Sequence, residues 1–257
     1  MENTDLIDSL QYRKHVELEP YFNTDLFNSI IISNQNPKQI MIEAGYLSNV
    51  ITRFWRLLQT EKLLNSKKGD SDYCDFLLET FLNQASSCSD NLATCLNYFL
   101  NLNLSGSKLA LHNEQYINRL KESITGFPDI VEIDFYHNWV KEKLYPYRNI
   151  VHHMGEASGY VEMSADYRSI VCCLTLKEEE WNFVEMRQNL KAFPSHTAWQ
   201  IATNNFPNTV DGSAEQANKY IRIDTFFKNW IEKVYNLIKK FVEAMVWFQT
   251  TTAANKC

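Results

Sequence analysis

The chain has 257 residues, of which 45% are hydrophobic and 22% are charged, and its formal net charge is −6. This is the composition of an ordinary globular protein with enough chain to bury a core. The acidic balance argues against a broad basic surface that coats nucleic acid, although a small local phosphate site remains compatible with it. Only 7 glycines and 6 prolines are present, which favours helices over a turn-rich β fold.

The N-terminal residues 1–6 contain neither a basic segment nor an apolar run, so we expect no signal peptide. The longest apolar runs, such as residues 244–248, fall far short of the roughly 18 to 20 residues of a membrane span. Six cysteines occur without a C-x-x-C pair, and Cys88 and Cys95 stand one heptad apart on an apolar stripe. We therefore expect free cysteines, no metal site, no cofactor, no membrane partner and a cytoplasmic location.

Residues 1–35 show no strong period, so we expect short helices or loops there. Asn36 and Pro37 then have the form of a helix start, with Asn as the N-cap and Pro at the first position. Apolar residues recur at intervals of three and four, which predicts an amphipathic helix to about Leu64. Its stripe consists of Ile40, Ala44, Leu47, Ile51, Phe54 and Leu58.

A second long helix is predicted after the polar turn at residues 66–71. Its buried side should carry Phe76, Phe81, Cys88, Leu92, Cys95 and Phe99. Residues 84–91 are polar enough to allow a kink or a break in this helix.

Two shorter helices are predicted next. Tyr116, Ile117, Leu120 and Ile124 mark the first, which should end at the Gly-Phe-Pro sequence that begins at Gly126. Residues 133–144 form the second, with an apolar face of Phe135, Trp139 and Val140. This helix runs into Pro146, and both a kink and a tight break are compatible with the sequence at that join.

Residues 156–212 differ in character from the helical segments. The β-prone runs at 159–164 and 168–176 predict a small hairpin, and a short helix is a further candidate at residues 181–190. We interpret the whole region as an insertion over the helical bundle and not as a second domain.

The last predicted element is the longest. Ser213 and Gln216 have the spacing of a capping box, and the apolar stripe behind them predicts a helix of about 35 residues, roughly 50 Å long. The stripe consists of Tyr220, Ile223, Phe227, Trp230, Val234, Leu237 and Phe241. The sequence thus predicts one mainly α domain over residues 1–257, an antiparallel bundle of four to five long helices.

The stretch at residues 145–155 concentrates the polar chemistry of the chain. It places Arg148, Asn149, His152 and His153 within six residues, directly after a proline that suits the first turn of a helix. Arginine is a fixed cation shaped to hold phosphate, and histidine titrates near neutral pH. These residue types together point to phosphate-ester chemistry.

The pattern Arg148-Asn149-x-x-x-His153 resembles the R-x4–6-H motif of the HEPN superfamily, in its common R-N-x-x-x-H form. The resemblance implies a metal-independent endoribonuclease of a toxin–antitoxin or antiviral defence system, with RNA as substrate and an antitoxin or other protein as partner. It also implies a homodimer in which two motifs face each other across one cleft. Arg148 would hold the phosphate, His153 would act as general acid/base while the 2′-OH attacks, and Asn149 would orient the site. Candidate auxiliary residues are Tyr147, His152 and His137.

Other interpretations of the motif stay open at this point. Some members of the superfamily keep the fold without activity, so the chain could be a silent helical module that binds a partner protein or a nucleotide. Arg148 and His152 could simply pair with Glu142 or Glu156 on the surface. His152 and Glu156 could also supply two metal ligands, although the sequence offers no third.

Overall fold

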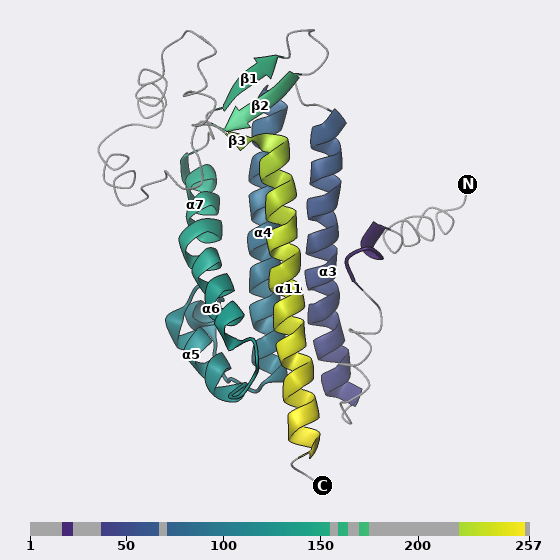
Figure 1. The fold of residues 1–257 in the computed structure, drawn as a ribbon, viewed down its shortest axis with the longest axis vertical. Coiled ribbons are helices and arrows are strands. Elements are labelled where there is room, and N and C mark those ends of the chain that lie inside the picture. Colours follow the sequence, from purple (N-terminus) through teal and green to yellow (C-terminus); the bar gives the residue numbers. More distant parts are fainter. Residues whose placement is uncertain are drawn as a thin grey trace, which may run out of the picture. The chain divides into compact units, whose positions relative to one another are not determined.

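The structure is a computed structural model that describes residues 17–22, 37–66, 71–154, 159–163, 170–174 and 221–254. Figure 1 shows the described elements, which are helices except for three short strands. The helices are α3 (Pro37–Ser66), α4 (Ser71–Phe99), α5 (Glu114–Ser123), α6 (Ile130–Trp139), α7 (Tyr145–Met154) and α11 (Ile223–Ala254), with a 3-10 turn at Gly106–Lys108 and a π-helical segment at Val140–Leu144. The prediction of a mainly α chain is therefore confirmed for the described residues.

Helix α3 begins at Pro37, as the sequence predicts, and extends to Ser66. Within the predicted stripe Leu47, Phe54 and Leu58 are buried. The predicted cap Asn36 and the side chains of residues 37–44 lie outside the described part of the structure.

Helix α4 is unbroken from Ser71 to Phe99, so the polar stretch at residues 84–91 does not end it. Several polar side chains in this stretch have partners, whereas the buried Oγ of Ser89 has no hydrogen-bond partner among the described residues. Arg53 Nη1 donates a hydrogen bond to Gln84 Oε1 at 3.1 Å, and Cys88 Sγ donates to the carbonyl oxygen of Val50 at 3.3 Å. Because buried polar groups that are hydrogen-bonded cost little, the helix continues through them.

Cys88 and Cys95 are free and buried, as predicted. Burial raises the pKa of the Cys88 thiol well above its usual value. This thiol therefore stays protonated at neutral pH and packs as a small hydrophobic group.

Two predicted core residues are exposed instead. Phe76 has an exposed fraction of 59% and Phe135 one of 57%, whereas Phe81 is fully buried. Phe76 lies five residues before Phe81, which turns it about 140° away around a helix of 3.6 residues per turn. The buried positions at this level of α4 belong to Leu77 and Leu78.

The chain forms two compact units. Unit 1 comprises residues 1–58, 84–141 and 231–257, and unit 2 comprises residues 59–83 and 142–230.

In unit 1, α3 and α4 run antiparallel, since Tyr46 stacks on Tyr98 while Arg53 bonds to Gln84. Helix α11 joins them through Tyr235, whose ring lies 6.3 Å from that of Phe54.

Helices α5 and α6 complete unit 1. The hydroxyl of Tyr116 on α5 donates to the carbonyl oxygen of Ala93 on α4 at 2.6 Å. Lys240 Nζ on α11 lies 2.7 Å from Asp129 Oδ2 and 3.2 Å from Glu132 Oε2, at the start of α6. Burial disfavours the Lys240 ammonium, but hydrogen bonds with these carboxylates and with Glu243 outweigh it and raise the lysine pKa.

Unit 2 is built around aromatic side chains from α4, α7 and α11. Phe81 stacks on Phe227 with ring centroids 4.1 Å apart. Tyr147 of α7 contacts Phe226 and Trp230 of α11 at 5.8 and 5.2 Å between ring centroids. Through these contacts α7, the helix that carries the Arg148–His153 motif, packs beside α11.

The three strands form one sheet in unit 2, in the order β1-β2-β3. Strand β1 (Gly159–Met163) pairs antiparallel with β2 (Ile170–Leu174), and both lie in the runs that the sequence identifies as β-prone. Strand β2 also pairs antiparallel with β3 (Ile221–Arg222).

Strand β3 corrects the predicted start of the last helix. The sequence predicts helix from Ser213, but α11 begins only at Ile223, because Ile221 and Arg222 pair with β2 through their backbones. Residues 175–220, which include the predicted capping box and the candidate helix at 181–190, lie outside the described residues. Beyond this start the predicted stripe is confirmed, with the following residues fully buried: Phe227, Trp230, Val234, Leu237 and Phe241.

Two phenylalanines on α4 provide a matched test of this packing. Phe81→Ala should lower the free energy of unfolding by about 3–5 kcal/mol, because it removes a fully buried ring that stacks on Phe227. Phe76→Ala should change it by less than about 0.5 kcal/mol, because that ring faces solvent. Urea denaturation of both variants measures the difference, and equal losses would contradict the assignment of the buried face.

Candidate functional site

The helix that carries the motif starts after an irregular turn. Helix α6 ends at Trp139, residues 140–144 are π-helical, and α7 starts at Tyr145. Pro146 has no N–H to donate to the carbonyl of Glu142, and its ring crowds that carbonyl. A wider turn accommodates this conflict without ending the helix, and such π turns often occur at functional sites. The join between α6 and α7 is thus a π turn, whereas the sequence was compatible with either a kink or a tight break.

Tyr147 anchors α7 within unit 2. Its side chain is buried, and its ring packs against Phe226 and edge-on against Trp230. Successive residues lie about 100° apart around an α-helix, so burial of Tyr147 turns Arg148 and Asn149 away from this contact. Both of these residues are half-buried.

Arg148 and Asn149 are joined by a side-chain hydrogen bond. Nη1 of Arg148 donates to Oδ1 of Asn149 at 3.1 Å. The Nε atom of Arg148 is buried and has no hydrogen-bond partner among the residues that the structure describes. A buried donor without a partner costs about 1–3 kcal/mol, and a phosphate oxygen is the kind of acceptor that would satisfy it. In the described part of the chain Arg148 makes no ion pair with Glu142.

His152 and His153 both lie within α7, but their side chains are outside the described part of the structure. The backbone places His153 four residues after Asn149 in the same continuous helix, which is the spacing of neighbours on one helical face. Glu156, considered above as an ion-pair partner or metal ligand, also lies outside the described residues.

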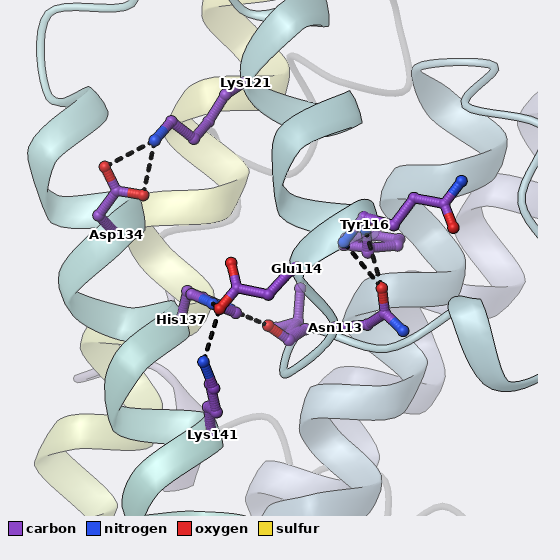
Figure 2. A network of polar contacts seen from close by, with 9 residues as sticks. Asn113, Glu114, Tyr116, Lys121, Asp134, His137 and Lys141 are labelled. Carbon is purple, nitrogen blue, oxygen red and sulfur yellow. Dashed lines mark hydrogen bonds and ion pairs between the residues drawn. The ribbon is translucent and has the colours of Figure 1, made fainter.

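His137, the remaining candidate auxiliary residue, belongs to unit 1, whereas the motif belongs to unit 2. Figure 2 shows its surroundings. Its Nδ1 lies 2.7 Å from the carbonyl oxygen of Leu111, and its Nε2 lies 3.4 Å from Glu114 Oε1. The same Glu114 oxygen accepts a hydrogen bond from Lys141 Nζ at 2.6 Å. The imidazole has an exposed fraction of only 4%.

The titratable groups around His137 shift one another's pKa values. The hydrogen bond from Lys141 is the largest influence that lowers the pKa of the Glu114 carboxyl, and nearby His137 adds to it. Burial lowers the pKa of nearby His112, and the charge of His137 lowers it further. The charge of Asp90 acts in the opposite direction and raises the pKa of His112.

The sequence did not single out Glu114 or His112. Glu114 opens α5 and His137 lies on α6, so no local spacing connects them, and only the turn that folds α5 back toward α6 brings them together. The one local signal is Asn113, whose side chain caps α5 by accepting hydrogen bonds from the backbone N–H groups of Gln115 and Tyr116.

No protein-family model, curated protein or solved structure matches this chain. Among the residues that the structure describes, no helix is both long enough and apolar enough to cross a membrane. Over the same residues, no group of three or more His, Cys, Asp or Glu side chains could hold a metal ion.

His112 makes the pH dependence of stability testable. Since folding lowers its pKa below 6.5, the folded state favours the neutral ring, and this contribution is present above the unfolded pKa and is lost as the pH falls. We expect wild type to lose more free energy of unfolding between about pH 7.5 and pH 5.5 than His112→Gln loses. Urea unfolding at both values measures this, and an equal or greater loss in the variant would contradict the assignment.

Proposed function

We propose that this protein is a metal-independent endoribonuclease of the HEPN type that acts on RNA as a homodimer. The observation that carries the proposal is the geometry of Arg148, whose Nη1 is hydrogen-bonded to Asn149 while its buried Nε has no partner within the described ranges of the chain. These two residues occupy the first two positions of the R-N-x-x-x-H pattern, and the continuous helix α7 keeps the pattern's spacing to His153.

Each motif residue has a distinct part in the proposed reaction. The ribose 2′-oxygen attacks the adjacent phosphorus, the bond to the 5′-oxygen breaks, and the products carry a 2′,3′-cyclic phosphate and a 5′-hydroxyl. Arg148 binds the phosphate and stabilises the negative charge that grows on its oxygens. Asn149 holds the Arg148 guanidinium in place through its Oδ1.

Proton transfer explains why a dimer suits this chemistry. One group must take the proton of the 2′-OH, and another must give a proton to the departing 5′-oxygen. A histidine with an ordinary pKa near 6.5 can do either at neutral pH, but not both in the same instant. Two copies of His153 across one cleft supply the base and the acid together.

The proposed setting is a toxin–antitoxin or antiviral defence system, in which an antitoxin or other partner protein restrains the nuclease. This setting rests on the resemblance of the motif alone.

A second candidate function is a catalytically silent helical module that binds a partner protein or a nucleotide. The net charge of −6 favours this candidate, because RNA-binding proteins usually present basic surfaces. If the first candidate is right, the folded protein cleaves RNA; if the second is right, it does not.

The test is cleavage of RNA in the presence of EDTA. Arg148→Ala and His153→Ala should each lower the rate by roughly 10²- to 10³-fold, since they remove a charge-stabilising donor and a general acid/base. Arg119→Ala is the matched control, because Arg119 is exposed and, in the described part of the chain, its guanidinium pairs with nearby Glu122. This variant should cleave like wild type.

Circular dichroism of each variant verifies that the fold is retained. Cleavage that survives unchanged in both motif variants would overturn the site assignment. A folded wild type that cleaves no RNA, but binds a nucleotide or a partner protein, would favour the silent module.

A further inference from the structure

A short segment near the N-terminus, residues 17–22, packs against the helices of unit 1. It forms a single turn, in which the backbone N–H groups of Tyr21 and Phe22 both donate to the carbonyl oxygen of Leu18 at 2.9 Å. Figure 1 draws it as the short dark purple segment beside α3. An isolated turn of this length is unstable in water, because too few hydrogen bonds offset the ordering of its backbone. Its contacts with the rest of unit 1 therefore hold it in this form.

Three aromatic side chains receive this segment, and we call them the α3–α11 surface: Phe54 and Trp55 of α3, and Tyr235 of α11. The ring of Tyr21 lies edge-on to Phe54 at 5.2 Å and to Tyr235 at 5.5 Å between centroids. The ring of Phe22 also lies edge-on to the same two rings, at 5.1 and 5.7 Å. Edge-on contact is a favourable geometry for aromatic pairs, so the surface is complementary to two adjacent aromatic residues.

One polar contact adds selectivity to this apolar packing. Trp55 Nε1 donates a hydrogen bond to Glu17 Oε2 at 2.7 Å. Leu18 and Phe22 are buried, whereas Glu19 between them is exposed. A spacing of four residues places two anchors on one face of a turn, which is the way an amphipathic segment docks onto helices. The contacts thus select an acidic residue, an aliphatic anchor and an aromatic pair in a fixed order.

The contacts are few enough for the segment to detach. Only Leu18 and Phe22 of its six residues are buried. The gain from burying two such side chains is similar in size to the conformational entropy lost when a segment of this length is ordered. Residues 23–36 join the segment to α3, so it remains tethered after it detaches and returns at a high effective concentration. Its departure would uncover the ring of Phe54, which is fully buried in the structure.

We propose that the α3–α11 surface is a docking site for short protein segments in which an acidic residue and a leucine precede, by one turn, two adjacent aromatic residues. Residues 17–22 are its built-in, exchangeable ligand, and a partner protein that presents the same chemistry competes with them for the surface. The site shares no residue with the motif on α7, so its test does not involve RNA.

A fluorescent peptide with the sequence of residues 14–25 tests the site on the full-length chain. Leu18→Ala combined with Phe22→Ala weakens the built-in ligand. This double variant should bind the peptide at least about tenfold more tightly than wild type, in which the tethered segment competes. A peptide with the same two alanines should bind neither protein. Fluorescence anisotropy measures the binding, and a folded double variant that binds no better than wild type would overturn the proposal.

The hydrogen bond between Glu17 and Trp55 provides a matched control for the mode of docking. With the double variant as receptor, Glu17→Ala in the peptide should weaken binding by roughly three- to tenfold, the scale of a lost hydrogen bond to a charged group. Trp55→Phe in the receptor removes the N–H donor and keeps an aromatic ring, so the two peptides should then bind equally. The same loss with both receptors would show that the peptide binds elsewhere and would overturn the assigned site.

Hydrogen exchange of wild type tests the proposal even if the double variant fails to fold. Amides that are released when the segment detaches exchange faster than amides that are released only when the bundle unfolds. We expect the amide hydrogens of Tyr21 and Phe22 to exchange at least about 100-fold faster than that of Phe54, and faster still with excess peptide. Protection equal to that of Phe54, unchanged by the peptide, would show that the segment is a fixed part of the core and would refute the exchangeable ligand.

Discussion

The contact of Tyr147 with Phe226 and Trp230 is the interaction on which the motif helix depends. It buries the ring of Tyr147 against α11 within unit 2. Aromatic pairs of this kind contribute about 0.5–1.5 kcal/mol beyond the burial of their area. Because this contact fixes the rotation of α7, it also decides which way the next two residues face. Arg148 and Asn149 therefore face away from the Tyr147 contact and share a hydrogen bond.

The sequence predicts the helical framework well where burial follows one stripe. Intervals of three and four located α3 and the buried face of α11, because most of the described residues in these two stripes, including Phe54 and Trp230, are buried. Phe76 and Phe135 were wrongly assigned to the core, since a large apolar side chain was given more weight than its angle around the helix. The start of α11 was wrong for a different reason. The strand pairing that removes Ile221 from the helix depends on a partner strand far away in the sequence.

The candidate site was likewise predictable from the sequence only in part. Arg148 and Asn149 are neighbours in sequence, so a short pattern could identify them, and the structure adds their mutual hydrogen bond. The cluster around His137 links two helices through contacts between distant residues, and no spacing rule identifies such a group. His137 and His153 are also assigned different kinds of role. His137 is buried and its Nδ1 lies 2.7 Å from a backbone carbonyl oxygen, which suits a structural role, whereas His153 is proposed as catalytic because of its position after Arg148 and Asn149.

The central claim is that α7 carries an RNA-cleaving site that works without metal. It is tested most directly by mass spectrometry of the ends that the wild-type protein produces from a defined RNA in EDTA. The proposed chemistry predicts a 2′,3′-cyclic phosphate on one fragment and a 5′-hydroxyl on the other, with neither formed when the cleaved nucleotide carries a 2′-deoxy sugar. Fragments with a 5′-phosphate, or no fragments from the folded protein, would contradict it.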